Sequence, residues 1–373
     1  MDLLSFIDDE NVSEIRIKKK KILSDSSNGN IRNIDVQLSI EVIYSSTQTE
    51  KKKTVKEYIE YWLYHVKKNT LKQTSFDRKE RTINGQLMPY FKDKTLDEVT
   101  ADDIQFMVND LTSKGLSYST IKKAVETTKE FYQFAVDRNE VSKNPASTVT
   151  LPKNIEKQKS DIKFFNEDEV KKIVFESKRL YETGNLIHRL GYIVPFLLNT
   201  GMRVGEALSL KWIDIDFSKK TIFIHSSSAL VKNRDETSEN YKKYKIIEQS
   251  TKTKNGERII QITDTVMQCL RFMQNNEIKS EYVFPSQKGL ISSHSSVDKM
   301  FRSILRNCGL KETGIHALRH TYASLLFKRG VDVKIISELL GHSSVDITYN
   351  TYIHLVKEQH ILAVGKLEKK NLT

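Results

Sequence analysis

The stretch TGMRVGEAL, residues Thr200–Leu208, follows an apolar run that predicts a buried helix over residues 187–199. Gly201 indicates a turn from which a second helix starts, so we expect Arg203 in its first turn and Glu206 one turn further along the same face. A guanidinium at the positive end of a helix presents a fork of N–H donors that matches phosphate oxygens. Taken alone, an exposed Arg–Glu pair on a helix explains the same residues.

A second segment, STKTKNGER, is rich in lysine and holds the turn signal Asn255-Gly256. Strand patterns on both sides of this signal predict a hairpin over residues 246–262, because Asn-Gly favours a tight turn between two strands. We expect Lys252 and Lys254 on or beside its tip, from which a long side chain can reach into a groove. Lysines at exposed turns are common, so this segment alone says little about function.

A third segment, HALRH, begins at His316. His316 and Arg319 are three residues apart and share one face of the helix that this segment predicts, and Gly330 is placed to end that helix. His316 and His320 are four residues apart, a spacing that two metal ligands can have. No carboxylate lies between them and Arg319 would repel a cation, so we expect no metal at this position.

The fourth segment, LGHSSVD, begins at Leu339. Gly341 is predicted to end a short helix, and the serines that follow are predicted to start the next one, which leaves His342 in a tight turn between them. Tyr352 lies ten residues after His342, and Tyr349 lies one helical turn earlier. A single tyrosine on an amphipathic helix is usually a packing residue, so neither tyrosine indicates chemistry by itself.

The composition bounds the class of protein. The chain has 373 residues, which suggests two or three domains, and a formal net charge of +12, which indicates a polyanionic partner such as nucleic acid. Residues 1–50 carry a net charge of −3, so the excess lies in the rest of the chain. No apolar run approaches the roughly twenty residues of a membrane helix, and the two cysteines form neither a disulfide framework nor a metal knuckle. We expect no signal peptide, no membrane contact and a cytoplasmic location.

Hydrophobic periodicity divides the chain into segments. Alternating residues on both sides of a Ser-Asn-Gly turn predict a hairpin or small sheet, and so a small β-rich domain, in residues 1–50. Helical spacing over residues 54–150 predicts an all-α domain of about four helices, and the Lys-rich residues 151–163 predict an exposed linker. Residues 164–373 carry a mixed pattern, with helices, a strand over residues 220–225 and a small antiparallel sheet. The expected fold is multidomain and mainly α, with an all-α domain followed by an α+β domain.

Together these segments resemble the tyrosine recombinases of the phage integrase family. The resemblance runs from about Thr54 to Tyr352 and rests on the motifs T-G-M-R-x-G-E, K-T-K-x-G-x-R, H-x-L-R-H-T and L-G-H-S-S, in this order. It implies that residues 54–150 form a SAM-like core-binding domain and that residues 164–373 form the catalytic domain with a C-terminal tail. The two domains would form a clamp around duplex DNA, and residues 1–50 take the place of an arm-type domain.

The resemblance implies a site-specific recombinase that cleaves and rejoins DNA through a 3′-phosphotyrosine intermediate, with no metal, ATP or other cofactor. Its catalytic residues would be Arg203, Lys252, His316, Arg319, His342 and Tyr352. The arginines and histidines would bind the phosphate oxygens, Lys252 would protonate the leaving 5′ oxygen, and Tyr352 would attack the phosphorus. Lys254 stays open as an alternative to Lys252, and Tyr349 as an alternative to Tyr352.

The resemblance also implies supporting residues and partners. Glu206 would orient Arg203, and His320 would serve the structure around the site. The partners would be specific double-stranded DNA sites and a homotetramer assembled on DNA from monomers or weak oligomers, with an accessory DNA-bending or excision factor. The element served would be a phage or another mobile element, and the apolar tail over residues 355–367 would dock on a neighbouring protomer. Two other functions stay open: a non-catalytic DNA-binding regulator on the same scaffold, and a topoisomerase or resolvase with the same chemistry.

Overall fold

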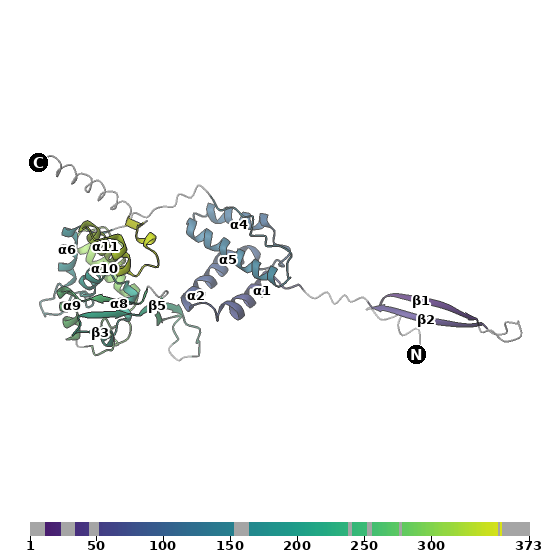
Figure 1. The fold of residues 1–373 in the computed structure, drawn as a ribbon, viewed down its shortest axis with the longest axis horizontal. Helices are drawn as coiled ribbons and strands as arrows, with labels where there is room; N and C mark the ends of the chain where they lie inside the picture. Colours follow the sequence, from purple (N-terminus) through teal and green to yellow (C-terminus); the bar gives the residue numbers. More distant parts are fainter. Residues whose placement is uncertain are drawn as a thin grey trace. The chain divides into compact units, whose positions relative to one another are not determined.

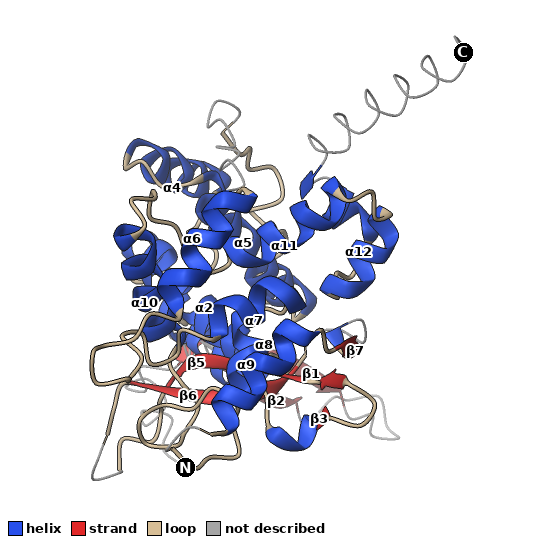
Figure 2. Cartoon of the chain, turned by 90° about the vertical axis from the view of Figure 1, so that its left-hand side faces the viewer, coloured by secondary structure: helices blue, strands red, loops and turns tan. Residues whose placement is uncertain are grey.

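The computed structural model describes most of the chain, namely residues 12–23, 34–44, 52–152, 164–237, 241–251, 256–275, 278–349 and 351–352. The chain packs as two compact units, one made of residues 1–66 and 82–151 and the other of residues 67–81 and 152–373 (Figure 1). Helices make up most of the described chain (Figure 2). None of the helices in these ranges is long and apolar enough to cross a membrane. The predicted linker over residues 151–163 and the predicted tail lie almost wholly outside the described residues.

The N-terminal segment contains two paired strands. Strands β1 (Val12–Leu23) and β2 (Ile34–Tyr44) are antiparallel, and Ile17 lies opposite Ile40 in their register. This pairing confirms the strands that the alternating pattern predicts.

The rest of the first unit is helical, as the spacing of its apolar residues predicts. Its elements are α1 (Val55–Tyr61), a π-helical continuation (Trp62–Lys67), a second π-helical turn (Ile83–Leu87), α3 (Met88–Phe91), α4 (Ala101–Ser113) and α5 (Tyr118–Asp137). Thr100 begins α4 with a capping box to Asp103, and Ser117 caps α5 by accepting from the backbone of Thr120. Trp62 and Phe131 meet edge to face at 5.7 Å between ring centroids in the core of this unit.

The second unit contains most of α2 (Gln73–Thr82) and the elements from residue 164 onward. The helices are α6 (Glu167–Ser177), α7 (Ile193–Thr200), α8 (Val204–Ser209), a 3-10 turn (Trp212–Asp214), α9 (Asp264–Gln274), α10 (His294–Asn307), α11 (Ala317–Lys328) and α12 (Val333–Leu340). The strands are β3 (Ile215–Asp216), β4 (Thr221–Ile224), β5 (Ser226–Lys232), β6 (Tyr244–Ser250) and β7 (Arg258–Gln261). Helix α7 packs against both α9 and α11, and α6 packs beside α10.

The strand pairing corrects one prediction. Strands β6 and β7 do not form the hairpin predicted about Asn255-Gly256: β6 pairs with β5, and β7 pairs with β4 in the sheet β3-β4-β7. The alternation of β7 explains its partner, because Ile260 is buried opposite the buried Ile222. An Asn-Gly signal predicts a turn, but it does not determine which strands pair on either side of it.

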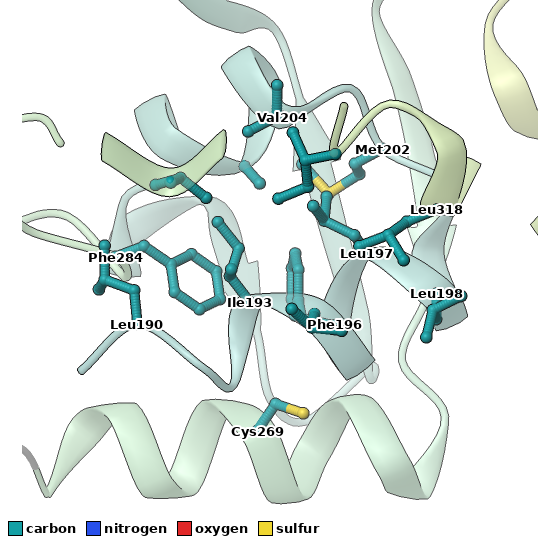
Figure 3. Packing of buried hydrophobic residues seen from close by; sticks show 14 of the residues in the cluster. Leu190, Ile193, Phe196, Leu197, Leu198, Met202, Val204, Cys269, Phe284 and Leu318 are labelled. Carbon is teal, nitrogen blue, oxygen red and sulfur yellow. The ribbon is translucent and has the colours of Figure 1, made fainter. Parts of the chain in front are cut away.

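The core of the second unit surrounds α7. Phe196 of α7 meets Phe284 edge to face at 5.0 Å between ring centroids, and Cys269 of α9 belongs to the same buried cluster (Figure 3). The apolar run predicted that this helix begins at residue 187, but α7 begins at Ile193. The residues before it form a turn in which the backbone of Gly191 donates to the oxygen of His188 at 2.6 Å, and position 191 needs glycine because a Cβ atom would stand 1.7 Å from the backbone oxygen of Ser177.

Candidate active site

Two helix ends place Arg203. Gly201 ends α7 in the left-handed conformation, with φ at 61°, and Arg203 is the residue immediately before α8. Arg203 therefore precedes the first turn of the helix in which the sequence predicted it. Its Nη1 donates to Oε1 of Glu206 at 2.7 Å and its Nη2 donates to the backbone oxygen of Gly341 at 3.2 Å. These bonds hold one guanidinium between the start of α8 and the end of α12.

A buried carboxylate joins two arginines. Glu206 is 3% exposed, and its Oε2 accepts from Nη2 of Arg258 at 2.9 Å as well as from the backbone of Arg203. Burial favours the neutral form of the Glu206 carboxyl, but Arg258 and Arg203 outweigh this and hold its pKa below the ordinary value. Glu206 thus orients Arg203, as expected.

Arg258 is a site residue that the sequence analysis did not select. Its side chain is nearly buried, it donates to Glu206, and its Nε donates to the backbone oxygen of Leu339 at 2.9 Å. The signal was present, because Arg258 is the final residue of the motif K-T-K-x-G-x-R.

Arg319 lies where two helices end. It is 3% exposed; its Nη1 donates to the oxygen of Gly201 at 2.8 Å and its Nη2 to the oxygen of Leu340 at 2.6 Å. Carbonyl groups at helix C-termini lack helical partners and carry the negative end of the helix dipole, so they suit a buried cation. Burial, together with Arg203, lowers the pKa of Arg319 to about 9, which leaves its side chain charged at neutral pH.

The two histidines complete this group. His316 is the residue before α11, and it is exposed and lines the cavity described below. His342 follows the left-handed Gly341 at the end of α12, and its Nδ1 lies 2.7 Å from Oγ1 of Thr348. Desolvation by the surrounding protein, together with nearby charges such as that of Arg319, lowers the pKa of each ring to about 4. Both rings are therefore neutral at neutral pH and can act as hydrogen-bond donors.

A cavity of about 410 Å³ brings these residues together. The described residues that line it include Arg203, Glu206, Ser227, Gln249, Ser250, Thr251, Gly256, His316, Arg319, Gly341, His342 and Ser343. Four of the six predicted catalytic residues thus meet at one cavity although they come from three separate segments of the sequence. Among the described lining residues the two arginines outnumber the one carboxylate, so the cavity suits an anion.

Of the remaining two predicted residues, the structure describes only Tyr352. Lys252 lies outside the described residues, and so does its alternative Lys254. Tyr352 is described but is not among the lining residues: its side chain is 1% exposed, and its hydroxyl lies 2.9 Å from Nδ1 of His320. Tyr349 is 41% exposed.

The metal alternative rested on His316 and His320. Their rings meet edge to face at 4.9 Å between centroids, the geometry of a packed pair. In the part of the chain that the structure describes, no group of three or more His, Cys, Asp or Glu side chains could hold a metal ion.

Comparison with known proteins identifies the family. Residues 163–359, just over half of the chain, match the phage integrase family, and residues 54–112 match the phage integrase N-terminal SAM-like domain. The chain belongs to the phage integrase family. A tyrosine recombinase XerC-like protein of Caldanaerobacter subterraneus is 33% identical to it over 336 residues, 84% of this chain and 82% of the relative.

Further relatives agree with this assignment. The integrase of Staphylococcus phage L54a is 26% identical over 331 residues, which cover 83% of this chain and 91% of that protein. The structure of the Tn1549 transposon integrase in complex with transposon right end DNA has the same fold, with a TM-score of 0.66 at 22% identity over 80% of this chain and 95% of that one. The predicted family and fold class are thus confirmed, and the protein is a tyrosine recombinase, an enzyme of site-specific DNA recombination.

Proposed function

We propose that the cavity binds the scissile phosphate and that Arg203, His316, Arg319 and His342 hold its non-bridging oxygens. The observation that carries this proposal is the convergence of these four side chains on one cavity. A phosphodiester is anionic, and the transition state of its cleavage carries more charge on the same oxygens. Two fixed guanidinium groups and two neutral imidazole donors match that distribution of charge.

We propose Tyr352 as the nucleophile. Its hydroxyl gives up its proton to water as the oxygen attacks the phosphorus, the bond from phosphorus to the 5′ oxygen breaks, and a 3′-phosphotyrosine forms as the free 5′ hydroxyl leaves. The proton that this leaving oxygen needs comes from Lys252, with Lys254 as the alternative donor. Attack by a 5′ hydroxyl from another strand reverses the step and rejoins the DNA. One ester replaces another of similar energy, so the exchange requires no ATP.

The biological setting is part of the same proposal. Residues 54–150 and 164–373 form the two domains of a clamp, and the protein assembles as a homotetramer on two DNA sites in the cytoplasm. Lambda integrase, which shares the fold, is a tetramer in its structure bound to a Holliday junction. Relatives named as the integrase of a phage and as the ICEBs1 integrase support integration of a mobile element as the task. Excision of the element and an accessory bending or excision factor belong to the same proposal.

A covalent-trapping assay tests the proposed chemistry. Nicked duplexes taken from the DNA that flanks the encoding element are incubated with wild type, Tyr352→Phe and Tyr349→Phe, and adducts are separated on a denaturing gel. The adduct should be lost in Tyr352→Phe alone. An adduct lost only in Tyr349→Phe would reassign the nucleophile, and tight DNA binding without any adduct would favour a non-catalytic regulator.

The same gel separates the two lysines. A 5′-bridging phosphorothiolate gives a leaving sulfur that needs no proton, so it restores cleavage to a variant that lacks the general acid. We expect this substrate to rescue Lys252→Ala and to leave Lys254→Ala unchanged. Rescue of Lys254→Ala instead would assign the proton to that residue.

A further inference from the structure

The hydroxyl of Tyr352 is engaged away from the phosphate cavity. It lies 2.9 Å from Nδ1 of His320, and the Tyr352 ring packs against Phe327 at 5.4 Å between centroids. The side chain is 1% exposed and belongs to a buried cluster with Ile336 and Leu340. A phosphate in the cavity has no access to a hydroxyl buried in this way, so Tyr352 must move before it can attack.

The pair is chemically matched. Burial lowers the pKa of His320, and Arg319 lowers it further, so the ring is neutral at neutral pH. Burial also raises the pKa of the Tyr352 hydroxyl, so it stays protonated. A neutral imidazole with its hydrogen on Nε2 accepts at Nδ1, and the protonated phenol is the donor that this nitrogen requires.

His320 also touches the wall of the cavity. Its ring meets that of His316 edge to face at 4.9 Å between centroids, and His316 lines the cavity. One residue of α11 thus contacts the buried tyrosine on one side and a phosphate-binding residue on the other.

We propose that His320 is a positioning residue that holds Tyr352 in a resting place beside the phosphate cavity and that this hydrogen bond must break before cleavage. The inference rests on the proposed role of Tyr352 as nucleophile. It explains how a recombinase can bind DNA with its phosphate-binding residues assembled while its nucleophile is still withheld. The acceptor of the phenol is His320, so removing that acceptor favours release of Tyr352.

The test compares two substitutions of His320 in the full chain. His320→Asn keeps a polar atom close to the position of Nδ1, whereas His320→Leu removes the acceptor at similar size. Melting temperatures are measured first to establish that both variants fold. If His320→Leu does not fold, His320→Gln replaces it, because the amide of the glutamine side chain extends beyond the position of Nδ1. Two readouts follow: nitration of Tyr352 by tetranitromethane without DNA, and the single-turnover rate of adduct formation on a nicked duplex at saturating DNA.

Tyr349 is the internal standard for nitration, because it lies three residues away and is 41% exposed. In wild type and His320→Asn, Tyr352 should be nitrated far more slowly than Tyr349. In His320→Leu the nitration rate of Tyr352 and the adduct rate should each rise about 2- to 10-fold, the range expected from one net hydrogen bond.

Two results would overturn the proposal. Nitration of Tyr352 that stays slow in His320→Leu would mean that packing alone withholds the tyrosine. An adduct rate reduced about 100-fold and partly restored at higher pH would make His320 the proton acceptor of the reaction instead. The nitration readout does not depend on chemistry, so an adduct that persists in Tyr352→Phe would refute the proposed nucleophile without hiding the state of this hydrogen bond.

Discussion

Replacing Glu206 by Gln tests whether the cavity depends on its single carboxylate. The substitution keeps the size of the side chain but removes the charge that Arg203 and Arg258 share, and it turns an N–H₂ group toward one guanidinium. Arg258 is nearly buried and cannot regain the lost interaction from water, whereas Arg203 is 39% exposed and partly can. Removing one partner of a buried ion pair costs about 3–5 kcal/mol, and the exposure of Arg203 places this case near the lower end, about 3 kcal/mol.

Thermal unfolding of the full chain measures this loss. For a domain of this size, 1 kcal/mol lowers the melting temperature by roughly 2–4 °C, so Glu206→Gln should lower it by about 6–12 °C. Glu281→Gln is the matched control, because Glu281 also pairs with a cation, Lys211, but is 62% exposed. The control should change the free energy of unfolding by less than about 0.5 kcal/mol.

The stability difference between wild type and Glu206→Gln should also depend on pH, in a direction that follows from the lowered pKa of Glu206. A carboxyl whose pKa is lowered in the folded state stabilises the fold above its ordinary pKa, here 4.5, and loses that contribution as the pH falls through the folded-state value. The difference between wild type and Glu206→Gln should therefore be full at pH 7 and shrink below about pH 4.5. If Glu206→Gln melts within 2 °C of Glu281→Gln, roughly the effect of 1 kcal/mol or less, the argument that the carboxylate holds the two arginines is wrong.

Other substitutions test the remaining parts of the site. Arg319→Lys should slow adduct formation about 100-fold or more in a single-turnover gel assay, because an ammonium cannot bind two carbonyl groups and a phosphate as a fork does; a loss below about 5-fold would contradict this. Gly201→Ala should destabilise the protein by about 2–4 kcal/mol in thermal melts, because its Cβ would stand 2.4 Å from the Tyr322 ring at a φ of +61°. Gly309→Ala is the control: its φ is +69° and no described atom lies within 4 Å of the added Cβ, so it should show only the smaller cost of backbone strain. Equal losses of stability in the two variants would refute the clash. Because the pKa of His342 lies at about 4 and below its ordinary 6.5, its contribution to stability should be full above pH 6.5 and fall as the pH decreases toward 4, an effect that unfolding curves of His342→Gln should lack.

The helix boundaries near the cavity followed from local sequence. Gly201 was predicted as the turn from which a helix starts and Gly341 as the end of a helix, and both adopt the left-handed conformation that a non-glycine residue resists. Elsewhere in the chain, Thr100 and Asn166 are N-caps that each form a capping box with an acidic residue three positions later. These features depend on a few neighbouring residues, which is why a sequence can predict them.

The strand partners did not follow from local sequence. The pairing of β5 with β6 joins segments with no turn signal between them that the sequence analysis recognised, and the Asn255-Gly256 signal suggested a different pair. Pairing is decided by which buried faces match across the sheet, and that is a property of the folded chain.

The site shows the same division between local and distant information. Motif spacing selected Arg203, His316, Arg319 and His342, and the structure brings all four to one cavity. Motif spacing could not show that Arg319 binds the ends of two helices, because Leu340 and Gly201 come close to Arg319 only in the folded chain.

Two neighbouring residues of α11, Arg319 and His320, contact different parts of the site. Arg319 donates two of its five N–H groups to carbonyl oxygens, which fix the plane of the guanidinium and offset the cost of burying its charge. One residue further along α11, His320 binds the hydroxyl of Tyr352, which lies outside the described cavity wall. In the proposed mechanism, the phosphate-binding half of the site is therefore preorganised, whereas the proposed nucleophile Tyr352 must be released into it. Binding can then precede cleavage, because the electrostatic stabilisation needs no rearrangement and the covalent step does.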